Sequence, residues 1–208
     1  MELEKIKKSV TKNKKIKSLV YTLMINKVRT RPRWWLRLFR FLYCRTGAGS
    51  IMYRSVRKDL VPFNPFFLGK NSVVEDYSVL NNFVGSIAIG DNTRVGLHNV
   101  VIGPVSIGNN VNIAQGVVFS GLDHNYKDVK LRIDQQGVST SQIVIEDDVW
   151  IGANAVVTKG VRIGRHSIIA ACSLVNRDIP PYCVAAGNPA VIIRKYNPEK
   201  DTWERTEN

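Results

Sequence analysis

Cysteine is scarce in this chain, and its few copies are unevenly spaced. Only Cys44, Cys172 and Cys183 occur among 208 residues. An odd number without close pairs matches neither a disulfide framework nor a zinc knuckle. We therefore expect free or buried thiols, as in proteins of a reducing compartment, and we predict a cytoplasmic location.

Long apolar runs are also missing. The longest one near the start, Leu19 to Ile25, has seven residues and includes a threonine. A membrane-spanning helix needs roughly 20 apolar residues, so we expect neither a spanning helix nor a secretory signal peptide in this sequence. The hydrophobic share of 44% is enough for the core of one domain with an appendage.

Acidic residues are almost absent from residues 1–58, which hold 17 Lys and Arg but only 2 Asp and Glu. Residues 59–208 hold 13 basic and 15 acidic residues, so the excess positive charge is confined to the first quarter of the chain. We predict a basic, aromatic-containing extension over 1–62, with 2–29 as a basic helix or a disordered arm. Arg33, Arg37 and Arg40 then follow at helical spacing, on one stripe of a second helix.

Aliphatic residues recur every six positions through much of the remaining chain. One run of this repeat consists of Ile145, Ile151, Val157, Ile163, Ile169 and Val175. A period of six suits neither an isolated helix nor a hairpin, but it suits a solenoid whose coils have three short, flat sides. About fifteen hexads predict an all-β solenoid of about five coils over residues 63–187, stacked as parallel strands.

The repeat is interrupted once and ends before the chain does. Its register stops after Phe119 and resumes at Ile145, so we predict an excursion loop over 120–142. Excursions from a rigid scaffold commonly carry function. Residues 188–208 form a charged C-terminal tail, which we expect to be a short helix or an extended arm.

Two stretches of the chain carry a family resemblance. The runs IEDDVWIGANAVV and DIPPYCVAAGNPA resemble the hexapeptide-repeat acyltransferases, and among them the galactoside, maltose and colanic-acid O-acetyltransferases. The resemblance covers about residues 66–195. It implies a left-handed parallel β-helix, a homotrimer with active sites between subunits, acetyl-CoA as co-substrate and an acceptor linked to polysaccharide biosynthesis. Residues before 66 lie outside it and read more like an enzyme of surface-polysaccharide assembly.

His124 is the predicted catalytic base. It lies in the excursion, where the family has its catalytic histidine, and a neutral imidazole near pH 7 suits proton removal from a hydroxyl. Asp123 or Asp128 is a candidate for orienting the ring, and a backbone carbonyl is an equal alternative. His98 and His166 occupy hexad positions that usually point outward. They lie about three coils apart, too far to share a zinc ion, so we predict no metal site.

The remaining site residues follow from the resemblance. Those assigned to coenzyme A are Trp150, Ala153, Ala171, Asn176, Arg177 and Arg194. The arginines are expected at phosphates, although the family often has Thr and Lys where this chain has Asn176 and Arg177. His98, Asn99 and Asp123 are assigned to the acceptor. The family's acidic acceptor residue has no match, because Gly103 and Pro104 stand at its position.

Three functions follow in order of preference. The first is acetyl transfer from acetyl-CoA to a saccharide hydroxyl, with a small-molecule or glycan acceptor. The second keeps the chemistry and changes the acceptor to an amino sugar, a serine or a drug. The third is a β-helix scaffold without activity, which the intact excursion with His124 argues against.

Residues 1–58 leave three interpretations open. The arginine stripe with Trp34, Trp35 and Phe41 fits peripheral contact with an anionic membrane, on its inner face. A helical cap on the open end of the solenoid is equally consistent. Nucleic-acid binding is disfavoured, because the charge comes without a nucleic-acid motif.

Overall fold

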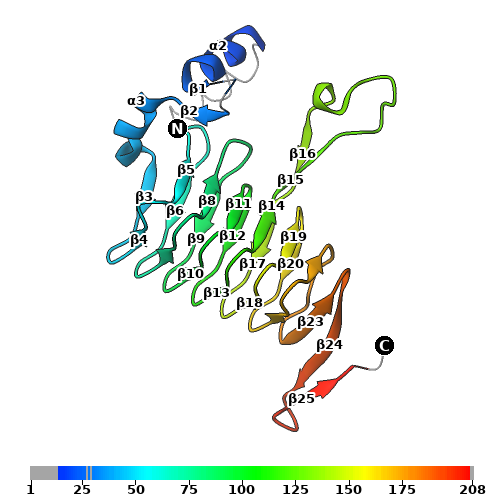
Figure 1. The fold of residues 1–208 in the computed structure, drawn as a ribbon. Helices are drawn as coiled ribbons and strands as arrows, with labels where there is room; N and C mark the ends of the chain where they lie inside the picture. The colour runs from blue at the N-terminus through cyan, green and yellow to red at the C-terminus, as the bar shows by residue number, and fades with distance from the viewer. Residues whose placement is uncertain (1–13, 27, 29, 207–208) are drawn as a thin grey trace.

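The computed structural model describes residues 14–26, 28 and 30–206 of the chain. Most of them form one prism of short parallel strands, with helices toward the N-terminus and an antiparallel hairpin at the C-terminal end (Figure 1). The prism is a left-handed parallel β-helix, which confirms the predicted fold. Within the described residues, no helix has both the length and the apolarity needed to cross a membrane.

Three flat sheets, named faces I, II and III, form the sides of the prism, and each coil runs from face I to II to III. Face I consists of β3 (Cys44–Thr46), β6 (Phe66–Leu68), β9 (Ile87–Ile89), β12 (Val105–Ile107), β17 (Ile143–Ile145) and β20 (Arg162–Ile163). Face II consists of β4 (Ile51–Met52), β7 (Val73–Val74), β10 (Arg94–Val95), β13 (Asn112–Ile113), β18 (Trp150–Ile151), β21 (Ile168–Ile169) and β23 (Cys183–Gly187). Face III consists of β5 (Arg57–Asp59), β8 (Val79–Asn81), β11 (Val100–Ile102), β14 (Val118–Ser120), β19 (Val156–Thr158) and β22 (Leu174–Val175).

The hexad residues stack in register from coil to coil. The pairs are Ile145 with Ile163, Ile151 with Ile169, and Val157 with Val175. All six side chains are at most 1% exposed. Burial of apolar surface, at roughly 25 cal/mol per Å², is therefore what holds neighbouring coils together. Because no coil buries its own core, the stack is the stable unit.

The β-helix begins one coil earlier than the sequence predicted. Strands β3, β4 and β5 lie within residues 1–62, which we expected to be a helical extension, and they pair in parallel with β6, β7 and β8. Faces I and III therefore have six strands each, against about five coils expected. The boundary between extension and β-helix moves accordingly from residue 63 to Cys44.

The first coil keeps the spacing of six but not the aliphatic residues. The positions that pair with buried aliphatic residues of the second coil hold Thr46, Met52 and Lys58. The Lys58 ammonium donates to the carbonyls of Tyr53 at 2.9 Å and Val56 at 3.2 Å. Burial lowers the pKa of Lys58. A search for aliphatic hexads misses this coil because a lysine replaces the hydrophobic residue.

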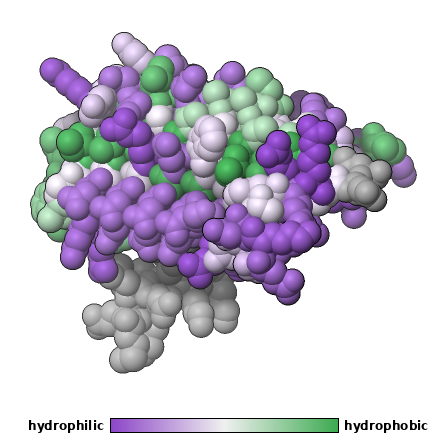
Figure 2. All heavy atoms as spheres, turned by 90° about the horizontal axis from the view of Figure 1, so that it is seen from below, coloured by the Kyte–Doolittle hydropathy of each residue, from purple (hydrophilic) through white to green (hydrophobic). Residues whose placement is uncertain are grey.

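A ladder of polar side chains runs along the edge between faces I and II. Asn71 donates to Asn92 at 3.4 Å, Asn92 to Asn110 at 3.4 Å, and Asn110 to Asp148 at 3.2 Å. All four residues have a left-handed backbone with φ between 53° and 60°, which Asn and Asp tolerate better than most residues. Viewed from below, hydrophilic residues form a band across the molecule beside exposed hydrophobic ones (Figure 2).

Glu146 lies on the same edge and links two coils. Its carboxylate accepts a hydrogen bond from the backbone N–H of Arg165 at 2.9 Å and pairs with the Arg162 guanidinium at 2.7 Å. The backbone hydrogen bond and, after it, the guanidinium stabilise the charged form and lower the pKa of Glu146.

Helices lie on the edge between faces III and I at the N-terminal end. This N-terminal unit comprises α2 (Lys14–Met24), β1 (Ile25–Asn26), β2 (Arg31–Pro32), α3 (Trp34–Leu38) and the 3₁₀ helix η1 (Arg40–Leu42). It packs through its own small core, in which Ile25 and Leu36 contact Val61 of the corner after β5. The predicted helical content is therefore present in the described segments 14–24, 34–38 and 40–42, with two short strands between the first two helices, while residues 1–13 lie outside the described part.

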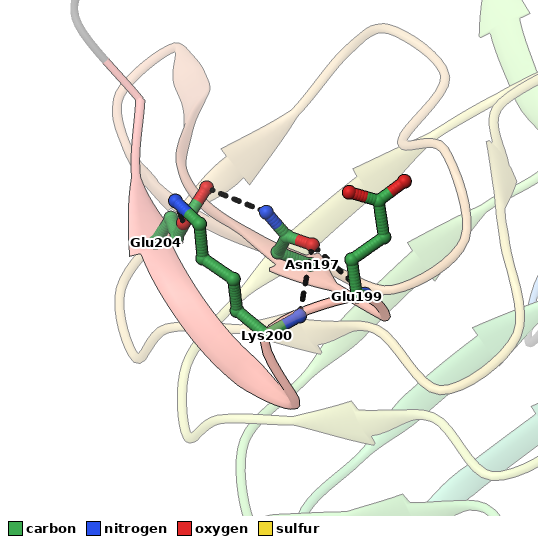
Figure 3. A network of polar contacts seen from close by, with 4 residues as sticks. All are labelled: Asn197, Glu199, Lys200 and Glu204. Atoms are coloured by element: carbon green, nitrogen blue, oxygen red, sulfur yellow. Dashed lines mark hydrogen bonds and ion pairs between the residues drawn. The ribbon is translucent and has the colours of Figure 1, made fainter.

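The C-terminal tail is a β-hairpin. Strand β24 (Ala190–Asn197) pairs antiparallel with β23 and with β25 (Thr202–Arg205), so the tail is extended and contains no helix in its described part, up to residue 206. Asn197 and Glu204 hold the turn (Figure 3). Asn197 donates to Glu204 at 3.2 Å and accepts from the backbone of Glu199 at 3.0 Å, and Lys200 pairs with Glu204 at 2.8 Å.

Candidate active site

The excursion is a second hairpin, which projects from the prism at the edge between faces III and I (Figure 1). It contains β15 (Leu122–His124), the 3₁₀ helix η2 (Ile133–Gln135) and β16 (Val138–Thr140). The chain leaves the coil at Gly121, whose backbone N–H donates to the Ile102 carbonyl at 2.9 Å. A Cβ at this position would lie 2.6 Å from the Pro104 nitrogen, so only glycine fits this close approach. His124 is the last residue of β15, lies opposite Val138 and is exposed.

Lys159, from the next coil, clamps the base of this hairpin. Its ammonium pairs with the Asp123 carboxylate at 3.0 Å and donates to the Ser139 hydroxyl at 2.6 Å, so it ties both hairpin strands to the prism. Sequence reasoning missed this residue. The only signal was a lysine beside a glycine in a hexad corner, which is common on any surface.

The loop of the hairpin is ordered by its own hydrogen bonds. The Gln136 amide accepts from the Asp128 backbone at 3.0 Å and donates to the carbonyls of Asp128 at 2.8 Å and Leu131 at 3.0 Å. The Asn125 N–H donates to the Gly137 carbonyl at 3.0 Å. The His124 imidazole therefore belongs to an ordered hairpin, because the next residue, Asn125, is hydrogen-bonded across its two strands.

The two aspartates predicted to orient the imidazole are engaged elsewhere. Asp123 pairs with Lys159, and the Asp128 carboxylate accepts from the Lys130 backbone at 2.9 Å. Among the described residues neither carboxylate hydrogen-bonds the His124 ring. In this structure Asp123 fixes the hairpin, and its predicted contact with the acceptor stays a prediction.

The two other predicted acceptor residues lie on a different edge, between faces II and III. Asn99 is fully buried, and its amide donates to the carbonyls of Gly96 at 2.7 Å and Ala114 at 2.9 Å. Its oxygen accepts from the Val117 N–H at 2.5 Å. The structure therefore corrects this assignment, because Asn99 braces the coil corner. His98 is exposed at the same corner.

The predicted coenzyme A residues divide between two edges. Ala153 and Ala171 are stacked at the edge between faces II and III, where a Cβ on Gly152 would lie 2.6 Å from the Ala171 nitrogen. Trp150 is 52% exposed on face II. Asn176 and Arg177 are exposed at the edge between faces III and I, two coils beyond His124.

Arg194 is exposed on the C-terminal hairpin, where it pairs in register with Val184 of β23. It thus stands at the end of face II, apart from both groups. In a single chain, the predicted base and the small residues Ala153 and Ala171 do not share an edge.

Each of the three histidines lies at a different edge of the prism. His98 follows face II, His124 follows face III, and His166 follows face I, where its ring lies 5.7 Å from that of Tyr182. In the described part of the chain, no three His, Cys, Asp or Glu residues are grouped in a way that suits a metal ion.

Two segments of the chain match known repeat families. Residues 142–177 match the family described as bacterial transferase hexapeptide (six repeats), and residues 86–119 match the hexapeptide repeat of succinyl-transferase. Both segments lie in the stacked coils, before and after the hairpin.

Among curated proteins, a 2,3,4,5-tetrahydropyridine-2,6-dicarboxylate N-acetyltransferase of Staphylococcus aureus is 39% identical over 95 residues. The match covers 46% of this chain and 35% of the relative. The chain therefore spans about a third of the length of the curated relatives that it matches.

Solved structures share the fold over most of the chain. AntD, an N-acyltransferase from Bacillus cereus in complex with dTDP and 3-hydroxybutyryl-CoA, has a TM-score of 0.67 at 16% identity and covers 81% of this chain and 91% of its own. A hexapeptide-repeat-containing acetyltransferase from Vibrio cholerae has a TM-score of 0.57 at 26% identity, over 95% and 94% of the two chains. In its complex with acetyl coenzyme A the TM-score is 0.54 at 28% identity, over 78% and 76%.

These relatives support the wider part of the sequence-based assignment. They include enzymes named for N-acyl transfer, whereas the motifs resembled galactoside, maltose and colanic-acid O-acetyltransferases. That narrower branch stays a prediction. The two family matches and the register of the coils show that residues 86–119 and 142–177 carry hexapeptide repeats like those of bacterial transferases.

Proposed function

We propose that the chain is an acetyl-CoA-dependent acetyltransferase, with His124 as general base and a saccharide hydroxyl as acceptor. The observation that carries the proposal is an exposed imidazole on a hairpin clamped to a hexapeptide β-helix by Lys159. The Vibrio cholerae relative supports the co-substrate, since its structure holds acetyl coenzyme A.

His124 supplies the proton transfer in this reaction. Its neutral imidazole takes the proton of the acceptor hydroxyl while the oxygen attacks the thioester carbonyl. The new C–O bond forms, the C–S bond breaks, and the proton passes to the departing sulfur. Such a base typically contributes 10²–10⁴-fold in rate, and a firmly held hairpin adds to this by fixing its position.

Several residues fit the binding of coenzyme A. Ala153 and Ala171 have small side chains in successive coils, which leaves the corner open to an approaching pantetheine chain. Arg177 and Arg194 offer exposed guanidinium groups that suit phosphates. Trp150, with half of its side chain exposed on face II, offers an apolar wall.

A second copy of the chain would bring the separated edges together. Face III presents an outward column of half-buried aliphatic residues in register from coil to coil: Val79, Val100, Val118, Val156 and Leu174. This face lies between the His124 edge and the edge of Ala153 and Ala171. A closed homotrimer that covers face III would place the site between subunits, as the resemblance implies. Light scattering of the purified chain measures this assembly.

A second acceptor class is supported by the relatives. Both the Staphylococcus aureus protein and AntD are named for transfer to nitrogen. An amino sugar therefore stands beside the saccharide hydroxyl as an acceptor. The base serves both, because an ammonium group must also lose a proton before it attacks a thioester.

An acceptor screen with His124→Asn tests the proposal. The full-length chain is mixed with acetyl-CoA and a panel of saccharides and amino sugars, and free thiol release is followed together with product mass. We expect thiol release with at least one acceptor and a loss of at least 100-fold in His124→Asn. His166→Asn, a surface histidine on another edge, is the matched control. Full activity in His124→Asn, or no release with any acceptor, contradicts the proposal.

A further inference from the structure

The N-terminal unit exposes large apolar side chains that its own small core leaves uncovered. In α3 only Leu36 is buried, while Trp34 is 73% and Leu38 63% exposed. The following η1 exposes Phe41 at 75% and Leu42 at 71%. Contiguous exposure of this kind marks a surface that binds something, because scattered single residues are the norm elsewhere.

Guanidinium groups lie beside Trp34, the first of these apolar residues. Arg31, Arg33 and Arg37 line, together with Trp34, a cavity of about 640 Å³ at the start of α3. The sequence has no Asp or Glu between Glu4 and Asp59. Asp59 itself is buried and pairs with Arg57 at 2.6 Å, and the charges of Arg31 and Arg37 act on its carboxyl from beyond ion-pair distance. No carboxylate of the described residues forms an ion pair with these three arginines.

We propose that the N-terminal unit is a docking surface for an anionic lipid bilayer. Arg31, Arg33 and Arg37 face the lipid phosphates, and each cation near an anionic surface contributes about 1 kcal/mol. Trp34 inserts at the level of the headgroups, where an aromatic ring with a polar N–H is favoured, and Phe41 adds apolar surface at the same boundary. Charge complementarity thus identifies the occupant of this surface.

The exposed aliphatic residues favour a bilayer over a nucleic acid as the binding partner of this surface. Leu38 and Leu42 are exposed beside the aromatic rings, as are Leu19 and Leu23 of α2. A nucleic acid offers phosphates and base faces but no hydrocarbon region, so it would leave these leucines in water. A bilayer interface accommodates the cations, the rings and the aliphatic chains together.

Docking would also bring the candidate base near the membrane. The N-terminal unit contacts Val61, Phe63 and Phe83 at the edge between faces III and I, and the His124 hairpin leaves the same edge two to three coils further on. At about 4.8 Å per coil, the two lie roughly 10–14 Å apart along the prism. Membrane docking does not depend on acetyl transfer, so a negative result for either proposal leaves the other one testable.

Vesicle co-sedimentation of the full-length chain tests the surface. Vesicles of phosphatidylcholine with about one third phosphatidylglycerol are compared with pure phosphatidylcholine, at low and high salt. We expect binding to the anionic vesicles that weakens with salt. Arg33→Gln combined with Arg37→Gln should weaken it by about 30-fold, and Trp34→Ser combined with Phe41→Ser should also release the protein.

Phe67→Ser combined with Lys70→Gln is the matched control. It removes one exposed aromatic and one exposed cation from the prism and should bind like the unmodified chain. The four side chains altered in the test variants are exposed, so their replacement should leave the fold intact. Thermal melts verify that the variants fold. Equal binding to both vesicle types, wild-type binding by either test variant, or binding only to a single-stranded oligonucleotide overturns the proposal.

Discussion

Replacing Lys159 with Met should loosen the hairpin that carries the candidate base while leaving the prism intact. The Lys159 side chain is 27% exposed and its partner Asp123 is 55% exposed, so their ion pair contributes only about 0.5 kcal/mol. The charged hydrogen bond to Ser139 adds about 1.5 kcal/mol. Loss of both lowers the local opening free energy by about 2 kcal/mol, which corresponds to about 30-fold more frequent opening.

Native-state hydrogen exchange measures this opening directly. The amides to follow are those of Asn125 and Ser141, which donate to the carbonyls of Gly137 and Gly121 across the hairpin. In Lys159→Met both should exchange about 30-fold faster, while amides of the buried strands keep their protection. Lys127→Met, an exposed lysine in the hairpin loop, is the matched control. Unchanged exchange at both amides, or faster exchange throughout the prism, would refute the reasoning.

Three further predictions concern the prism. Phe119→Ala removes a fully buried ring and should lower the free energy of unfolding by about 3–5 kcal/mol. Phe67 is 42% exposed, so Phe67→Ala should lower it by less than about 1 kcal/mol. Denaturant titration of the two variants measures both changes. Glu146→Gln should lower stability by about 1 kcal/mol at pH 7. The folded pKa of Glu146 is lowered, so its contribution to stability is complete above the unfolded pKa and is lost as pH falls through the folded pKa. The difference between the melts of the two proteins should therefore shrink steadily as the pH is lowered below the unfolded pKa. A thiol reagent at pH 8 should modify exposed Cys172 well before Cys44, because burial raises the pKa of Cys44 to about 11; equal rates would contradict this.

The solenoid was predictable because its physical requirement repeats in the sequence. Every interior coil buries one apolar residue per face, so the spacing of residues such as Ile151 and Ile169 predicts that they stack. The first coil was not predicted, because an end coil has a neighbouring coil on one side only and needs less apolar burial. That lower demand allows Lys58 at an inward position, where carbonyls of its own coil solvate the ammonium.

The candidate site was less predictable than the fold. The interruption of the repeat located the hairpin and His124, because a break in a strict period is visible in one sequence. The contact of Lys159 with Asp123 joins residues from two coils through long side chains, and no period encodes it. Asn99 was misassigned because the sequence does not reveal side-chain orientation. A corner asparagine can face a ligand or, as here, hydrogen-bond the backbone of its own coils.

The chain rejoins the stack after the hairpin without any slip of register. Val105 pairs with Ile143, and Phe119 with Val157, as if the detour were absent. The register of the prism therefore depends only on where the detour begins and ends, while Lys159 fixes the two strands at its base. Evolution or an engineer can exchange residues 125–138 for a longer, shorter or differently charged insert, and thereby change what the protein recognises while the coils keep their register.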